Sequence, residues 1–153
     1  MAGTFSQMYV QVVFAVKGRH NLITKPWNED VHKYIAGIIQ GKNQKSIIVN
    51  GMPDHIHVFL GLRPSTAISD VVRDIKNNST NFINEQQFVK GKFSWQEGYG
   101  AFTYSHSQVK GIYDYILNQE EHHATKTFKE EYIGLLEKFE IKYDEKYLFD
   151  WYD

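Results

Sequence analysis

The chain has 153 residues, 42% of them hydrophobic and 23% charged, which is the size and composition of one globular domain, residues 1–153. It has no cysteine, which excludes disulfides and thiolate metal sites and fits a cytoplasmic location. No apolar run approaches the roughly 20 residues that cross a bilayer, and no secretory signal pattern opens the chain, so we expect no membrane partner.

The net charge of −1 hides two unequal parts. Residues 1–119 contain 12 Lys and Arg against 8 Asp and Glu, a net of +4, and residues 120–153 contain 5 against 10, a net of −5. A mildly basic body permits contacts with nucleic-acid phosphates without requiring them. The acidic, aromatic tail at about 140–153 indicates no function by its composition, although a dimer would offer it a surface for packing.

The first third of the chain predicts a strand and a helix. Residues 8–16 are rich in Val, Tyr and Phe, which is typical of a strand. Pro26 suits the first turn of a helix, and Gly41 can end one. Between them, five apolar residues recur at helical spacing: Val31, Tyr34, Ile35, Ile38 and Ile39.

The middle of the chain predicts a β-hairpin and a second helix. Residues 46–49 and 55–62 are rich in β-branched residues, and Asn50-Gly51 between them is a turn signal. Pro64 then starts a helix with five residues on its apolar face: Ile68, Val71, Val72, Ile75 and Phe82.

The last part predicts two strands, at 92–96 and 99–104, and two helices. Ser105 with Gln108 resembles a capping box that starts a helix with four inward residues: Val109, Ile112, Ile116 and Leu117. A last helix is expected over about 127–139. The order β-α-β-β-α-β, then further helices, predicts an α+β, ferredoxin-like fold: an antiparallel sheet with helices on one face.

The first candidate site is the pair His55 and His57 on the predicted hairpin. Side chains alternate along a strand, so both imidazoles share a face, about 7 Å apart along the chain. Two such rings can bind one metal ion, and Asp54 could orient one of them. Spacing alone leaves half-buried or surface histidines equally open.

The second candidate site is Tyr115 with Gln119, which an i, i+4 spacing places on one face of the capped helix. The amide oxygen of Gln119 is a hard ligand suited to Mg²⁺ or Mn²⁺, and Tyr115 would be a nucleophile beside the metal. Spacing alone favours a packed tyrosine and a solvated glutamine. Tyr113 competes for the nucleophile role.

Three further groups have weaker claims to function. Arg73 and Lys76 belong to a basic, polar cluster that could hold phosphates or be a solvated face. His122-His123 is expected to be structural or solvated. Three aromatic residues could stack on bases, although packing on the sheet is favoured: Trp95, Tyr99 and Phe102.

Together these residues resemble a known family. Residues 52–59 are similar to the HUH signature, two histidines flanking one hydrophobic residue, of the small transposases of the insertion sequence 200/605 family. Residues 95–102 and 115–123 resemble the family's second block and its nucleophile helix, and 75–79 resembles its second helix. The blocks occur in the family's order, so the chain is identified as a member of the HUH single-tyrosine transposases.

The resemblance implies roles for particular residues. His55, His57 and Gln119 would bind a divalent metal, Mg or Mn, and Tyr115 would attack single-stranded DNA to leave a 5′-phosphotyrosine and a free 3′-OH. A second 3′-OH then rejoins the strand. Tyr104 stands where the family has a smaller apolar residue, which adds a third tyrosine near the site.

The resemblance also implies partners. Hairpins at the ends of the element would be the recognised DNA, with Arg73 and Lys76 as candidate contacts. A homodimer would share its active sites, the tyrosine helix of one chain completing the histidine site of the other. Two alternatives remain: an HUH endonuclease with a host role at repeated palindromes, and a non-catalytic ferredoxin-like module that binds single-stranded nucleic acid.

Overall fold

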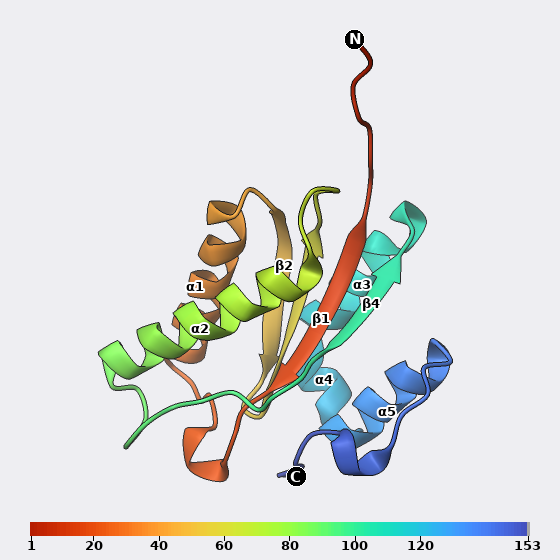
Figure 1. The fold of residues 1–153 in the computed structure, drawn as a ribbon. Helices are drawn as coiled ribbons and strands as arrows, with labels where there is room; N and C mark the ends of the chain where they lie inside the picture. The colour runs from red at the N-terminus through yellow and green to blue at the C-terminus, as the bar shows by residue number, and fades with distance from the viewer. Residues whose placement is uncertain (153) are drawn as a thin grey trace.

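The computed structural model describes residues 1–152, which form a four-stranded antiparallel sheet between two layers of helices (Figure 1). The strands are β1 Tyr9–Ala15, β2 Lys45–Met52, β3 His55–Gly61 and β4 Gly100–Tyr104. They lie in the order β2-β3-β1-β4, so that β1 and β3 are central. The chain runs β1-α1-β2-β3-α2-β4 before its last helices, which confirms the predicted α+β, ferredoxin-like order.

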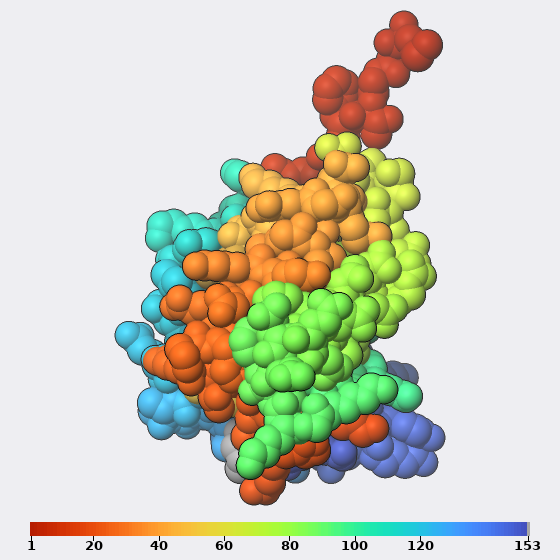
Figure 2. All heavy atoms as spheres, turned by 90° about the vertical axis from the view of Figure 1, so that its left-hand side faces the viewer, coloured from red at the N-terminus to blue at the C-terminus, as the bar shows by residue number. Residues whose placement is uncertain are grey.

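The helices cover both faces of the sheet. One face carries α1 Asn28–Gly41 and α2 Ile68–Gln86, which lie side by side in Figure 2. The other carries three helices: α3 Val109–Leu117, α4 Gln119–His123 and α5 Phe128–Lys138. Short 3-10 helices occupy three connections: Arg19–Asn21, His106–Gln108 and Glu145–Tyr147. Residues 1–8 are exposed, and the N-terminal end of the chain extends away from the body.

The central strand β1 is buried on both faces, which explains its almost continuous apolar sequence. Val12 and Phe14 pack into the core beneath α1 and α2. Val13 and Ala15 point the other way, into a second core under α3 and α5. The functional residues of β3 lie on this second face. Within residues 1–152, no helix is long and apolar enough to span a membrane.

The hairpin turn is not where the sequence signal placed it. Met52 pairs with His55, so the turn is at Pro53-Asp54, and Asn50-Gly51 lies inside β2. The glycine is required for a different reason: a Cβ on Gly51 would lie 2.2 Å from the carbonyl oxygen of His55. Close approach of two backbones, rather than a turn, explains the residue.

Other predicted boundaries also moved. Residues 92–96 form no strand, because only Trp95 makes an isolated bridge, to Val16. The second helix begins at Ile68 rather than near Pro64. The capping box of Ser105 is confirmed, but the helix that follows it ends at Leu117, whose side chain is 52% exposed instead of inward.

Candidate active site

The two histidines of β3 point to the same side of the sheet, and both are fully buried. Their ring centroids are 5.1 Å apart. The Nδ1 atom of His55 lies 2.6 Å from the Asp54 carboxylate, and that of His57 lies 2.9 Å from the Gln11 amide nitrogen. Tyr104 donates a 2.7 Å hydrogen bond to the Gln11 oxygen and so fixes the amide beside His57. Both Nδ1 atoms are thus occupied, which leaves both Nε2 atoms for the site.

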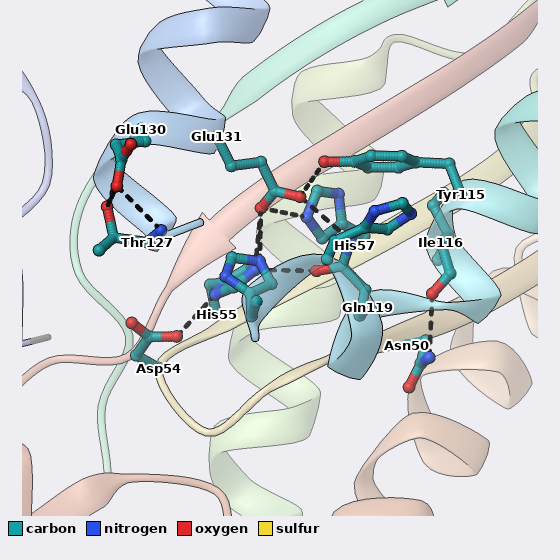
Figure 3. Close-up of polar contacts among 12 residues, drawn as sticks. Asn50, Asp54, His55, His57, Tyr115, Ile116, Gln119, Thr127, Glu130 and Glu131 are labelled. Carbon is teal, nitrogen blue, oxygen red and sulfur yellow. Dashed lines mark hydrogen bonds and ion pairs between the residues drawn. The ribbon is translucent and has the colours of Figure 1, made fainter. Parts of the chain in front are cut away.

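The Nε2 atoms face the carboxylate of Glu131, which α5 supplies (Figure 3). Its Oε1 atom lies 3.0–3.2 Å from three histidine Nε2 atoms: His55, His57 and His123. Its Oε2 atom accepts hydrogen bonds from the Tyr115 hydroxyl and, at 3.1 Å, from the Gln119 amide. Glu131 is 3% exposed, so one buried carboxylate joins all the candidate residues.

Sequence reasoning missed Glu131, although its position carried a signal. It lies in the last helix, three residues after Phe128 and four before Leu135. Both of these pack in the second core, so the spacing puts a carboxylate in the helix's apolar stripe. A charged residue on a buried helix face needs a partner, and that requirement indicates a site.

Tyr115 and Gln119 reach the same place from two helices rather than one. The chain leaves the helical geometry at Asn118, and α4 begins at Gln119. Even so, the oxygen of the buried Gln119 side chain lies 3.1 Å from the Nε2 of His55. The Tyr115 ring stacks on His122, with centroids 4.4 Å apart, and lies edge-on to His57 at 6.2 Å.

The structure places the two tyrosines of α3 in different surroundings. Tyr113 is 38% exposed, whereas the Tyr115 hydroxyl meets Glu131. The Asn50 side chain of β2 donates hydrogen bonds of 2.9 and 3.2 Å to the last carbonyls of α3, those of Ile116 and Leu117. This contact attaches the tyrosine helix to the histidine hairpin (Figure 3).

Burial and pairing set the charges in the cluster. Burial lowers the pKa of His55, but hydrogen bonds to Asp54 and Glu131 outweigh it and raise the pKa to about 9. Burial lowers the pKa of His57. Burial opposes ionisation of Glu131, yet nearby His57 and the histidine hydrogen bonds hold its pKa far below the usual range. Burial, and then the charge of Glu131, raise the pKa of Tyr115. The resting cluster therefore contains an ionised carboxylate and a protonated tyrosine.

The donor set fits a divalent metal. His55, His57 and Glu131 offer two ring nitrogens and a carboxylate oxygen, all within 4.8 Å of one another. The amide oxygen of Gln119 is adjacent. Mixed imidazole and carboxylate ligands suit Mn²⁺, and the oxygen donors also suit Mg²⁺. Glu131 adds the negative charge that two histidines and a glutamine lack.

The two candidate DNA contacts on α2 lie away from this cluster, on the other face of the sheet. Arg73 is engaged with two neighbouring carboxylates, those of Asp70 and Asp74, at 3.2 and 3.3 Å. Lys76 donates hydrogen bonds of 2.9 and 2.7 Å to the carbonyls of residues 96 and 98. Burial lowers its pKa to about 8. Lys76 thus supports the loop before β4.

Two of the weaker groups have defined places. His122 stacks on Tyr115 and His123 contacts Glu131, so of the structural and solvated places expected for this pair the structure shows the structural one, beside the site. Trp95 and Phe102 are 8% and 2% exposed and pack in the two cores, as the packing interpretation predicted.

Known proteins share this sequence pattern and this fold. The ISDra2 transposase TnpA of Deinococcus radiodurans is 26% identical over 124 residues, which cover 78% of this chain and 89% of that protein. A crystal structure from Deinococcus radiodurans R1, described as a transposase, has a TM-score of 0.62 at 23% identity, over 78% of this chain and 95% of that one. The structure of a REP-associated tyrosine transposase bound to a REP hairpin has a TM-score of 0.58 at 15% identity, over 83% and 76%.

The family match covers most of the chain. Residues 4–119, from before β1 to the first residue of α4, match the family described as transposase IS200 like. This range contains His55, His57, Tyr115 and Gln119, whereas Glu131 lies beyond it. The chain belongs to the IS200-like transposase family.

Proposed function

We propose that this transposase cleaves and rejoins single-stranded DNA through a covalent bond to Tyr115. The observation that carries the proposal is the convergence of the Tyr115 hydroxyl, the two β3 histidines and Gln119 on one buried carboxylate. Membership of the family supports DNA transposition as the biological role. The absence of cysteine and of a membrane-spanning helix in the described chain is consistent with action in the cytoplasm.

Two side chains perform the cleavage step. The Tyr115 oxygen forms a bond to phosphorus while the bond from phosphorus to the 3′ oxygen breaks. The hydroxyl proton leaves to solvent along the hydrogen bond that the hydroxyl makes to Glu131, and the leaving 3′ oxygen takes a proton from solvent. The products are a 5′-phosphotyrosine and a 3′-OH. Attack by another 3′-OH reverses the bond changes and rejoins the strand without ATP.

The proposed metal ligands are His55, His57 and Glu131, with the Gln119 oxygen beside them. A bound Mg²⁺ or Mn²⁺ would polarise the scissile phosphate and offset its charge. The remaining work belongs to the protein: Asp54 and Gln11 hold the two buried imidazoles in position.

The proposed partners are single-stranded DNA with hairpin ends and a second copy of the chain. The solved relative bound to a REP hairpin supports hairpin DNA as the ligand to test first. Sharing of active sites between two chains stays a prediction of the family resemblance. A host role at repeated palindromes is supported by the same structural similarity to the REP-associated transposase. The DNA around the gene would distinguish this host role from transposition.

The decisive experiment is an adduct assay with labelled single strands from the DNA that flanks the gene. With Mg²⁺ or Mn²⁺, the wild-type protein and Tyr113→Phe should give a covalent protein–DNA band on a denaturing gel. Tyr115→Phe should abolish this band, and EDTA should abolish it for all proteins. Loss in Tyr113→Phe alone would move the nucleophile. Binding without any adduct would favour the non-catalytic module.

A further inference from the structure

A cleft of about 370 Å³ opens between α3 and α5, on the side of the sheet that carries the histidines. Two of its lining residues are Tyr115 and Glu131, and two others are Gln11 and Tyr104, which hold His57 in place. The cleft therefore leads from the surface to the hydroxyl that the proposed reaction uses.

Two helical glycines keep the sides of this cleft open. Gly111 lies inside α3 and Gly134 lies inside α5, and both line the cleft. A Cβ at either position would meet no atom within 4 Å. Glycine inside a helix lowers its stability relative to alanine, so packing gives no reason for these two residues. The need for open space beside Tyr115 does explain both glycines.

Two lysines, Lys126 and Lys138, also line the cleft. Both are exposed, and neither belongs to any ion pair formed within residues 1–152. They lie in the part of the chain whose net charge is −5, yet they place positive charge at the entrance to the tyrosine. The Lys138 ammonium lies 5.8 Å from the centre of the Phe139 ring, and two ammonium groups without an ion pair beside an open cleft suit a chain of phosphates.

We propose that this cleft is the groove in which the DNA single strand lies during cleavage. The strand runs between α3 and α5, Lys126 and Lys138 contact phosphates on its backbone, and the phosphodiester between them faces the Tyr115 hydroxyl. The inference rests on the proposed function, from which it takes the nucleophile and the ligand class. It goes further by assigning strand binding to α5, which begins after the family match ends at residue 119.

The test separates strand binding from chemistry. A fluorescent oligothymidine strand is titrated with protein that carries Tyr115→Phe, in EDTA and at several salt concentrations, and anisotropy gives Kd. Gly134→Leu and Gly111→Leu each place a side chain in the cleft while improving helix propensity, and we expect each to raise Kd at least about tenfold. Replacing both cleft lysines by alanine should reduce the slope of log Kd against log salt by about 1.4, roughly 0.7 per lost phosphate contact.

Matched controls come from equivalent residues outside the cleft. Gly37→Leu alters a helical glycine of α1 that also faces open space, on the other face of the sheet. Lys129→Ala removes an exposed lysine of α5 that does not line the cleft. Both should bind the strand like the parent protein, and thermal unfolding should show that every variant is folded.

The outcomes for groove and chemistry are independent. Unchanged Kd in both glycine variants, with an unchanged salt slope in the double lysine variant, would overturn the groove even if the wild-type protein forms the Tyr115 adduct. Weaker binding in the cleft variants alone would support the groove, even if no adduct forms and the proposed reaction is rejected.

Discussion

At the scale of single residues, the site depends most on Glu131. A buried carboxylate is costly unless it is paired, and this one accepts hydrogen bonds from three imidazoles, an amide and a phenol. The Nε2 atoms that now donate to it are those that would present lone pairs to a metal. Glu131→Gln removes the charge and also replaces one of the two accepting oxygens by an amide nitrogen, which donates, so this variant tests the carboxylate as a whole.

Glu131→Gln should weaken Mn²⁺ binding by at least about tenfold, because it removes the anionic ligand from the buried set. Isothermal titration calorimetry of the purified protein with Mn²⁺ measures the change. Glu130→Gln is the matched control, because Glu130 is exposed and its capping hydrogen bonds with Thr127 can form with an amide. Equal affinity in the two variants would remove Glu131 from the ligand set and leave the two histidines with Gln119.

The contrast between Glu131 and the other site residues shows where sequence reasoning ends. His55 and His57 were predictable because strand alternation is a local rule, and Tyr115 with Gln119 because helical spacing is another. Neither rule predicts that the histidine pair and the pair Tyr115 and Gln119 lie together. Only the resemblance to the family placed all four residues in one site. Glu131 lies outside the matched range, and its contact with β3 spans 74 residues, so its position in an apolar helix stripe marked it as unusual without showing which residues it meets.

At the scale of elements, the tight pairing of β2 with β3 holds the histidine strand in place. Gly51 lies opposite Ile56, and a Cβ there would approach the His55 carbonyl oxygen to 2.2 Å and the Ile56 Cα to 3.0 Å. These atoms are backbone, so no side chain can move aside. Any larger residue must push the two strands apart at the histidines.

Gly51→Ala should lower the free energy of unfolding by about 1–3 kcal/mol, the usual cost of overpacking a closely fitted site. Urea denaturation followed by fluorescence measures it. Gly61→Ala is the matched control, because its Cβ would meet only the Lys45 side chain, at 3.3 Å, in the same strand pair. We expect a loss below about 0.5 kcal/mol there. Similar losses in the two variants would contradict the close approach at Gly51.

Element predictions succeeded where the deciding interaction is local. The capping box of Ser105 and Gln108 forms as predicted, and the helix expected over 127–139 begins after the Thr127 cap. Asn50-Gly51 gave a wrong turn position because the same dipeptide can form a turn or allow a close contact between strands. The pairing with the partner strand determines which of the two occurs. Residues 92–96 have a strand-like pattern, yet their backbone pairing is limited to the bridge of Trp95 with Val16, and the Gln96 side chain also binds the backbone of Val16 and Asp150.

At the scale of the whole molecule, the C-terminal segment folds back over the site of its own chain. Phe128 stacks on the His55 ring at 3.9 Å, and Phe149 and Trp151 pack around Phe128. The Tyr152 hydroxyl accepts a 2.7 Å hydrogen bond from the Gly18 amide. The acidic, aromatic tail thus packs on its own domain, a surface that composition alone did not indicate. It also holds α5, and with it Glu131, against β3.

This packing bears on whether active sites are shared between chains. Within one chain, Tyr115 already meets the carboxylate that its own histidines bind, and Asn50 fastens α3 to β2. Exchange of α3 between two chains would replace both contacts by the same contacts in trans. With the site completed within one chain, as in this structure, a mixture of Tyr115→Phe and His57→Ala proteins, each inactive alone, should form no adduct on the flanking DNA, because neither chain holds a complete site. Adduct formation only in the mixture would instead establish the shared site that the family resemblance implies. Sedimentation of the same mixture shows whether dimers are present. If dimers are present and no adduct forms, the two active sites of a dimer are independent. If only monomers are present and no adduct forms, each active site belongs to a single chain.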